Sequence, residues 1–180
     1  MPKNLKDIVF VSALRTSIGR LNGIYSKHKS HELGALVIRE ILNRTNLDPK
    51  KVDEVVMGQV LTGLTGQNPA RQAAISANIP IEKTAYVINQ VCGSGLRSVV
   101  AAYQSILSND SKIIIAGGQE SMSNSTEDAM LKDGLIDAYN NYHMGITAEN
   151  VAEKWNITRK AQDNFAFESQ NKTQQAIKNK

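Results

Sequence analysis

Short apolar segments alternate with helical patterns along the first 118 residues, and this alternation constrains the fold more than any other feature. Four segments have the apolar, β-branched composition of buried strands, at residues 7–14, 52–60, 85–89 and 112–116. Between them, apolar residues recur at spacings of three and four, as they do in helices. The resulting β-α-β-α-β-α-β order predicts an α/β fold with a largely parallel sheet covered by helices on both faces.

The predicted helices have recognisable ends. The first follows a polar loop that runs to His31, and Asp48 with the proline after it stops this helix. The second begins with Asn68 as N-cap, has proline at its first position and runs through Ala77. The third follows residues 92–95 and is amphipathic. Its apolar stripe is formed by Leu96, Val99, Val100, Tyr103, Ile106 and Leu107.

The character of the sequence changes after residue 118. Residues 119–141 are polar, and Ser125 with Asp128 three positions later has the form of a capping box at the start of a short helix. Two longer helical patterns follow, at residues 145–155 and 158–177. We predict no strand in this part, so the alternating pattern stops before the chain does.

Composition argues against several classes of protein. No apolar run approaches the roughly 20 residues of a membrane-spanning helix, so no membrane insertion is expected. The net charge is only +4, the basic residues are spaced out and aromatic residues make up 5%, so no nucleic-acid partner is expected. The first seven residues lack the apolar core of a signal peptide and the chain has one cysteine, which together predict a cytoplasmic protein without disulfides.

Cys92 is the first candidate for chemistry. It follows a predicted strand and lies directly before Gly93, Ser94 and Gly95, where a helix is predicted to begin. The positive end of a helix dipole favours a thiolate, and small neighbours let a substrate approach backbone N–H groups that can hold an oxyanion. A lone cysteine is also commonly a small buried hydrophobic residue, and the residues alone leave both interpretations open.

The three histidines give weaker indications. His28 and His31 are spaced to share a helical face, but no further ligand completes a metal site, so we expect two exposed loop histidines and no metal. His143 lies among polar residues and glycine, which mildly indicates a ligand contact. A nucleotide-binding α/β module is a weaker alternative, because no phosphate-binding Gly-Lys-Ser/Thr loop occurs.

Four segments resemble motifs of the thiolase family. Residues 89–97 (Asn-Gln-Val-Cys-Gly-Ser-Gly-Leu-Arg) resemble its acyl-enzyme motif, and residues 116–123 (Ala-Gly-Gly-Gln-Glu-Ser-Met-Ser) resemble its segment at the end of the fourth strand. Residues 142–152 are similar to the loop-domain motif of biosynthetic acetyl-CoA acetyltransferases, and residues 15–19 (Arg-Thr-x-x-Gly) fit the N-terminal loop. The matches are in order and spread over nearly the whole chain, and their form favours the acetoacetyl-CoA branch of the family.

The resemblance implies a fold and a reaction. A thiolase-like fold would place the first βαβαβαβ half at residues 1–119 and the incomplete start of a helical loop domain at residues 120–180. The reaction would be the Claisen condensation of two acetyl-CoA molecules to acetoacetyl-CoA and coenzyme A, or the reverse thiolysis. Cys92 would carry the acetyl group as a thioester. Coenzyme A thioesters would be substrates, and neither a cofactor nor a metal is implied.

The resemblance also implies the surroundings of the site. His143 and Met144 would border the pantetheine arm and the acyl pocket, and Leu135 would lie near the nucleotide of coenzyme A. The complete enzyme would be a homo-oligomer that binds acetyl-CoA or acetoacetyl-CoA.

The sequence departs from the family pattern in two respects. The resemblance covers only the front half of a family member, whereas the Gly-His-Pro and Cys-x-Gly motifs that activate the nucleophile and supply an acid/base thiol belong to the second half. The stretch between Met122 and Asp128 is shorter than in family members, in which a longer segment at this place takes part in tetramer assembly. The chain is therefore either part of an acetyltransferase, expected to be inactive alone, or a non-catalytic protein that binds acyl-CoA or a partner.

Overall fold

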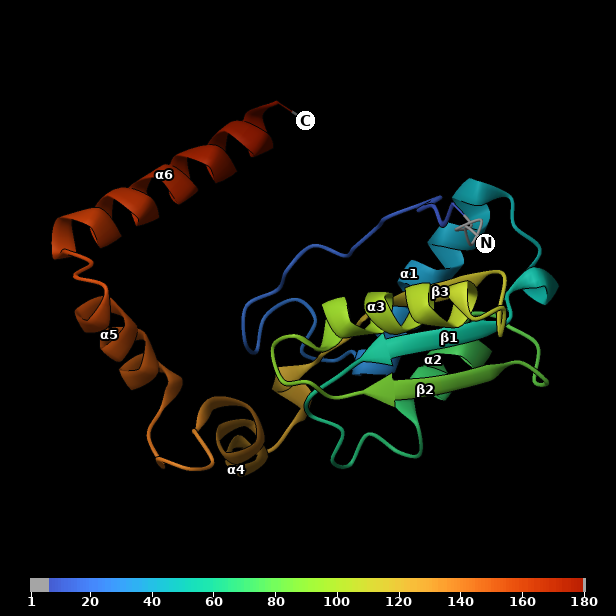
Figure 1. Ribbon diagram of the computed structural model, residues 1–180, viewed down its shortest axis with the longest axis horizontal. Coiled ribbons are helices and arrows are strands. Elements are labelled where there is room, and N and C mark those ends of the chain that lie inside the picture. The colour runs from blue at the N-terminus through green and yellow to red at the C-terminus, as the bar shows by residue number, and fades with distance from the viewer. Residues whose placement is uncertain (1–6, 180) are drawn as a thin grey trace, which may run out of the picture. The chain divides into compact units, whose positions relative to one another are not determined.

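The computed structural model describes residues 7–179 and contains a three-stranded parallel sheet, formed by residues before 119. The strands are β1 (Glu54–Gly58), β2 (Thr84–Ile88) and β3 (Ile114–Gly118), and their spatial order is β2-β1-β3 (Figure 1). Both neighbours of β1 run parallel to it. The α/β fold that the sequence predicts is confirmed.

Three helices cover the two faces of this sheet: α1 (Ser30–Thr45), α2 (Pro69–Ser76) and α3 (Ser94–Leu107). In Figure 1, α1 and α2 lie behind the sheet and α3 lies in front of it. Val55 of β1 belongs to the core that the sheet forms with α1 and α2, whereas Val56 is equally buried and points to the opposite face. Helices on both faces, as the β-α-β order predicts, are therefore present.

The core between the sheet, α1 and α2 combines branched and very small side chains. Alanines on α2 let this short helix approach α1 and the sheet closely, while the larger residues of α1 fill the space between them. The buried residues of the two helices in this core are Ala35, Ile38, Leu42, Ala70, Ala73 and Ala74.

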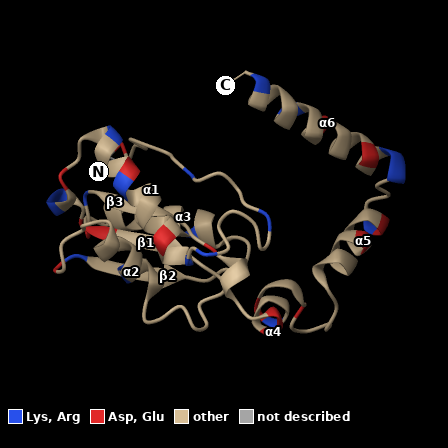
Figure 2. Ribbon diagram, turned by 180° about the vertical axis from the view of Figure 1, so that it is seen from behind, with Lys and Arg blue, Asp and Glu red and all other residues tan. Residues whose placement is uncertain are grey.

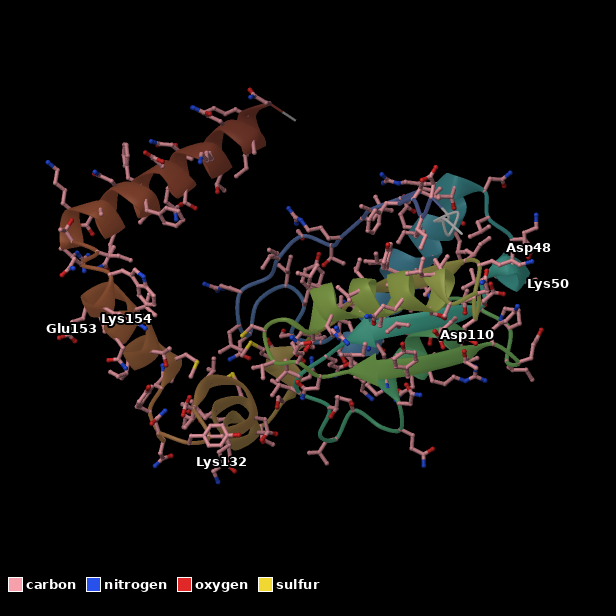
Figure 3. All side chains as sticks on the ribbon, viewed as in Figure 1. Asp48, Lys50, Asp110, Lys132, Glu153 and Lys154 are labelled. Atoms are coloured by element: carbon pink, nitrogen blue, oxygen red, sulfur yellow. The ribbon has the colours of Figure 1, made fainter. Side chains whose placement is uncertain are left out.

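Side-chain caps fix where two of the helical elements begin. Asn68 accepts a hydrogen bond from the backbone nitrogen of Arg71 at 3.0 Å, as expected of the N-cap of α2. Asp48 caps the 3-10 helix η1 (Pro49–Lys51) in the same manner and accepts from the backbone nitrogen of Lys50 at 3.0 Å (Figure 3). The predicted stop of α1 before Asp48 and start of α2 at Asn68 are both confirmed.

Helix α3 presents its small residues to the sheet, which the apolar stripe did not predict. Ser98 is completely buried and Ala102 nearly so, whereas Leu96 is 73% exposed and Tyr103 and Leu107 are also exposed. An apolar stripe normally faces the core, but here the helix axis approaches the sheet too closely for large side chains on the inner side. The position of the apolar stripe is a poor guide to the packed face of this helix.

The strand predicted at residues 7–14 is absent, and the prediction was wrong. This segment has no regular secondary structure and lies outside the sheet, and Val9, Phe10 and Val11 are exposed. β-rich composition produces a strand only where a partner strand accepts its hydrogen bonds. Both edges of β1 are already paired, and the N-terminal segment pairs with neither β2 nor β3.

The chain after β3 forms three short helical turns: η2 (Met122–Asn124), α4 (Glu127–Ala129) and the π-helix η3 (Met130–Leu135). The short helix predicted near Ser125 is present, but its cap is different. Thr126 is the N-cap, and its hydroxyl accepts from the N–H three residues further on at 3.2 Å. The start is displaced by one residue because the threonine hydroxyl, not that of Ser125, faces the free N–H groups of the helix.

The chain divides into two compact units, the first ending at Gly134 and the second beginning at Leu135. The second unit contains α5 (Met144–Lys154) and α6 (Arg159–Lys178), and Thr158 caps α6 as predicted. No described residue of these two helices is buried. The boundary expected between residues 119 and 120 concerns the domains of the complete family fold and stays a prediction.

Charged residues of both signs are interspersed along the ribbon of both units (Figure 2). Three exposed pairs lie four positions apart on helical turns: Arg44 with Glu40 at 2.6 Å, Lys132 with Asp128 at 3.0 Å, and Arg159 with Asp163 at 2.7 Å. Such exposed pairs each contribute only about 0.3–0.5 kcal/mol. Among residues 7–179, no helix combines the length and the hydropathy that a bilayer crossing requires.

Candidate active site around Cys92

Cys92 lies in the turn between β2 and α3, and its thiol is free and exposed. The turn connects Ile88, the last residue of β2, to Ser94, the first residue of α3. The strand-turn-helix placement that the sequence predicts for this cysteine is therefore present. Because the side chain is exposed, it is not the small buried hydrophobic residue of the alternative interpretation.

The backbone of this turn is tightly hydrogen-bonded. Gly93 N–H donates to the Gln90 carbonyl at 3.0 Å, and Ser94 N–H donates to the Val91 carbonyl at 3.0 Å. The amide oxygen of Asn89 accepts from the Val91 N–H, also at 3.0 Å. Val91 has a φ of +49°, a left-handed conformation that is rare for a β-branched residue. The residue before the thiol is thus held in a strained conformation.

A pocket of about 340 Å³ opens beside Cys92 at the carboxyl ends of β1 and β3. In parallel α/β sheets, ligands bind at this edge, outside the carboxyl ends of the strands. Small and polar residues dominate its wall. The lining residues are Gly58, Gln59, Val60, Val91, Cys92, Ser94, Gly95, Gly118, Gln119 and Glu120.

Glycines on the strand ends allow the start of α3 to approach the sheet. A Cβ on Gly58 would lie 2.3 Å from the carbonyl carbon of Ser94, and one on Gly118 would lie 3.3 Å from the Cα of Gly95. Only glycine fits at Gly58, because the obstructing atoms belong to the backbone. This close approach places Cys92 directly at the sheet edge and explains why α3 turns small residues inward.

A second, polar cluster completes the pocket. Gln119 donates from Nε2 to the Oε1 of Gln59 at 2.9 Å, and Gln59 donates in turn to the Leu61 carbonyl at 2.8 Å. Both glutamine side chains are buried. Next to them, burial raises the pKa of Glu120, although its carboxylate accepts hydrogen bonds from backbone N–H groups that favour the charged form.

Gln59, Ser94 and Glu120 are pocket residues that the sequence did not single out as candidates. Gln59 and Glu120 follow the carboxyl ends of two neighbouring parallel strands, which meet at one sheet edge. The predicted strands hid this relationship, because Gln59 lies inside the strand predicted at residues 52–60 and Glu120 lies four positions after the strand predicted at residues 112–116. Ser94 carried no signal, because a serine at the start of a helix ordinarily indicates only a cap.

The other predicted site residues belong to the second unit. His143 is the N-cap of α5, and its Nδ1 accepts from the Gly145 N–H at 3.0 Å. His143 also pairs with Ile136 in an isolated antiparallel bridge, which brings the ends of the segment from Leu135 to Met144 together. The structure thus groups Leu135, His143 and Met144 within one unit, while Cys92 belongs to the other.

The prediction of two exposed loop histidines is correct for His28 and wrong for His31. His28 is exposed in the loop before α1, and its Nδ1 lies 3.9 Å from Glu32. His31, by contrast, lies within α1 and is half-buried, and desolvation by burial lowers its pKa. The helix begins one residue before His31, so this side chain packs on the fold rather than in a loop. Within residues 7–179, no group of three His, Cys, Asp or Glu side chains is arranged to hold a metal.

Comparison with known proteins identifies relatives along nearly the whole chain. The family model described as "Thiolase, N-terminal domain" matches residues 8–129 and 124–180. A protein named acetyl-CoA acetyltransferase from Paracoccus denitrificans is 50% identical over 186 residues, covering 94% of this chain and 48% of the relative. One of the same name from Rhizobium meliloti is 50% identical over 188 residues, covering 96% and 48%. A mouse protein named acetyl-CoA acetyltransferase, cytosolic, is 47% identical over 187 residues, covering 95% and 47%.

The chain spans about half the length of the curated relatives that it matches. The alignment with the Paracoccus protein spans 186 positions, whereas 94% of 180 residues is about 169, so about 17 residues of that relative have no counterpart here. The family model matches in two pieces that overlap at residues 124–129, a range that falls largely within the stretch between Met122 and Asp128 predicted to be shortened.

Proposed function

The chain belongs to the thiolase family, and on that premise we propose that it carries the acyl-accepting cysteine of an acetyl-CoA acetyltransferase. The substrates are coenzyme A thioesters, acetyl-CoA in the condensing direction and acetoacetyl-CoA in thiolysis. The complete protein is cytoplasmic and acts as a homo-oligomer. The names of the relatives, one of which is called cytosolic, support the reaction and the compartment.

One observation carries this proposal: an exposed thiol stands on a strained turn at a pocket formed by the carboxyl ends of parallel strands. A nucleophilic cysteine needs access to its substrate and a position near positive backbone dipoles. Cys92 precedes the N-terminus of α3, a helix of 14 residues, and therefore meets both requirements.

The acyl transfer proceeds in two steps. In the first, the Cys92 thiolate attacks the carbonyl carbon of acetyl-CoA, a new C–S bond forms, and coenzyme A leaves as a thiolate that takes up a proton. In the second, another acetyl-CoA that has lost a methyl proton to a base attacks the thioester carbon. A C–C bond forms, Cys92 leaves as thiolate, and acetoacetyl-CoA is released. The chain contains neither a Gly-His-Pro sequence nor a second cysteine to serve as that base.

We assign the binding of the coenzyme A moiety to the second unit. His143 and Met144, where α5 begins, border the pantetheine arm and acyl group, and Leu135 contacts the nucleotide. The fixed tautomer of His143 supports a binding role: Nδ1 accepts a hydrogen bond from Gly145, so in the neutral ring the proton resides on Nε2 and is available to a ligand.

Peptide mass spectrometry after incubation with acetyl-CoA tests the proposed acyl acceptor. We expect an acetyl group on the peptide that contains Cys92, removable by hydroxylamine as a thioester is. The Cys92→Ala variant serves as the control and should remain unmodified. An unmodified Cys92 peptide in the folded wild-type chain would refute the proposal.

A second function, binding of acyl-CoA without turnover, is supported by the pocket beside Cys92, which can hold a ligand without any acid/base chemistry. Equilibrium binding of coenzyme A to Cys92→Ala distinguishes the two functions together with the acetylation experiment. Binding without acetylation of the wild-type thiol supports a non-catalytic acyl-CoA protein, whereas binding with acetylation supports the transferase.

A further inference from the structure

The turn that carries Cys92 is held by a hydroxyl group from the helix that follows it. The Oγ of Ser94 accepts a hydrogen bond from the Gln90 N–H at 2.9 Å and donates one to the Val91 carbonyl at 2.6 Å. Both partners precede Cys92 and Ser94 follows it, so this hydroxyl closes the turn around the thiol-bearing residue. Ser94 is 4% exposed, and its single proton is used within the turn.

Val91 explains why the turn needs such a clamp. Its φ of +49° is unfavourable for a β-branched side chain, and such a conformation persists only where the surroundings over-determine it. Burial does not supply this constraint, because Val91 is 51% exposed. Hydrogen bonds do: its carbonyl accepts from both the N–H and the hydroxyl of Ser94, and its N–H donates to Asn89.

The clamp is itself fixed to the sheet. The backbone of Ser94 lies so close to Gly58 that a Cβ there would be 2.3–2.5 Å from three backbone atoms at Ser94 and Gly95. The position of the Ser94 hydroxyl relative to the strand ends is therefore set by backbone packing. The hydroxyl in turn holds the backbone of Gln90 and Val91, the two residues before Cys92, by hydrogen bonds. The position of the thiol-bearing residue therefore depends on the position of this hydroxyl.

We propose that Ser94 is a positioning residue for Cys92, which holds the thiol at the pocket mouth by stabilising the left-handed conformation of Val91. This role deepens the proposed function, because it names what orients the acyl acceptor. Ser94 acts through the turn, since the residue is buried and both hydrogen bonds of its hydroxyl are made to the turn.

Ser98 supplies a matched control within the same helix. It lies one helical turn after Ser94, it is completely buried, and its hydroxyl lies 2.7 Å from the Gly95 carbonyl and 2.8 Å from the Gly117 carbonyl. Loss of this hydroxyl removes a buried hydrogen bond between α3 and β3 without touching the Cys92 turn. Effects on general stability and effects on the thiol are thereby separated.

The experiment measures the second-order rate of Cys92 alkylation by iodoacetamide in the full chain. We expect Ser94→Ala to lower this rate about fivefold or more, since a small displacement of a reacting atom has large kinetic effects, and Ser98→Ala to leave it within about twofold of wild type. The isosteric pair Ser94→Thr and Ser94→Val adds a second comparison. Thr retains the hydroxyl and should preserve the rate, whereas Val lacks it and should behave as Ala does.

The possible outcomes separate this inference from the proposed function. Equal alkylation rates in wild type and Ser94→Ala, or equal losses in Ser94→Ala and Ser98→Ala, would overturn the positioning role. If circular dichroism shows that Ser94→Ala and Ser94→Val both fail to fold, the Ser94 hydroxyl is a requirement of the fold and the proposal is also overturned. A selective loss in Ser94→Ala and Ser94→Val supports it, even if acetyl-CoA acetylates none of the chains, a result that would refute only the transferase.

Discussion

The carboxylate of Glu120 accepts a hydrogen bond from the backbone nitrogen of Val60 at 2.8 Å, and so ties the end of β3 to the end of β1. The next N–H, that of Leu61, also donates to this carboxylate, at 3.3 Å. The two strand ends are sixty residues apart in sequence, and together they form the wall of the pocket beside Cys92. A partly buried carboxylate therefore maintains the shape of the candidate site.

Removal of the Glu120 carboxylate should destabilise the fold. We expect Glu120→Ala to lower the free energy of unfolding by about 1–3 kcal/mol, because two backbone N–H groups lose their acceptor. Glu120→Gln should cost less, since the amide oxygen can still accept from Val60. Urea denaturation followed by circular dichroism measures both, and an alanine variant as stable as wild type would contradict the assigned role.

The pH dependence of stability at Glu120 has a definite sign. Burial raises the pKa of this carboxyl in the folded protein, so the folded state binds its proton more tightly than the unfolded chain does. The contribution of this protonation to the free energy of unfolding is therefore fully present below the ordinary glutamate pKa. It is lost as the pH rises through the raised pKa of Glu120 in the folded protein. The stability of wild type relative to Glu120→Gln should fall across that interval; a constant difference would exclude the shift.

Asp53 should show the opposite dependence. Hydrogen bonds from the backbone N–H groups of Lys112, at 2.8 Å, and Ile113, at 3.1 Å, lower the pKa of its carboxyl, with a smaller contribution from Lys83. Its stabilising effect is present above the ordinary aspartate pKa and is lost as the pH falls through the lowered value.

Asp53→Asn provides the test. At neutral pH we expect it to lower the free energy of unfolding by about 1 kcal/mol, the usual net value of a hydrogen bond. The difference from wild type should shrink as the pH falls below the ordinary range of aspartate. Asp163→Asn is a suitable control, because Asp163 forms only an exposed ion pair with Arg159. A difference that grows at acid pH would contradict the assignment.

The sequence predicted what depends on local pattern and failed where partners decide. Helix limits at Asn68 and Thr158 followed from caps, whose effect lies within one turn. The strand at residues 7–14 was wrong because pairing is a property of the whole sheet. The inward face of α3 was also hidden, because it depends on the space that Gly58 leaves beside Ser94. Cys92 was found because the residues that mark it as a candidate are its neighbours in sequence. Glu120 was missed because its partners, the N–H groups of Val60 and Leu61, are about sixty residues away in the sequence.

Val91 stores strain that a substitution can release. Asn adopts the left-handed conformation more readily than a β-branched residue, and the half-exposed Val91 side chain contributes little burial. We expect Val91→Asn to raise the free energy of unfolding by about 1 kcal/mol. Val9→Asn, at an exposed position without a positive φ, should leave it unchanged. A loss of stability on Val91→Asn would show that the turn does not strain this residue.

Residues 1–180, expressed alone, should have negligible condensation activity. They contain no Gly-His-Pro sequence, and Cys92 is the single cysteine, so no second thiol can remove the methyl proton of acetyl-CoA. Loss of a general acid or base typically lowers a rate about 10²–10⁴-fold. The measurement is steady-state thiolysis of acetoacetyl-CoA, compared with a full-length acetyl-CoA acetyltransferase. A rate close to that of the full-length enzyme would contradict this expectation.

Self-association of the chain should depend on the N-terminal segment. Phe10 is 82% exposed, and Val9 and Val11 beside it are 71% and 79% exposed, in a stretch that lies outside the sheet. Exposed apolar residues on unpaired extended backbone promote association between copies.

We expect Phe10→Lys to lower the apparent mass measured by light scattering at a given concentration. Ser12→Lys adds the same charge in the same segment without removing an apolar side chain, so it should have a smaller effect. Equal effects of the two variants would attribute the change to charge alone, and a wild-type chain that is monomeric throughout would refute the expectation.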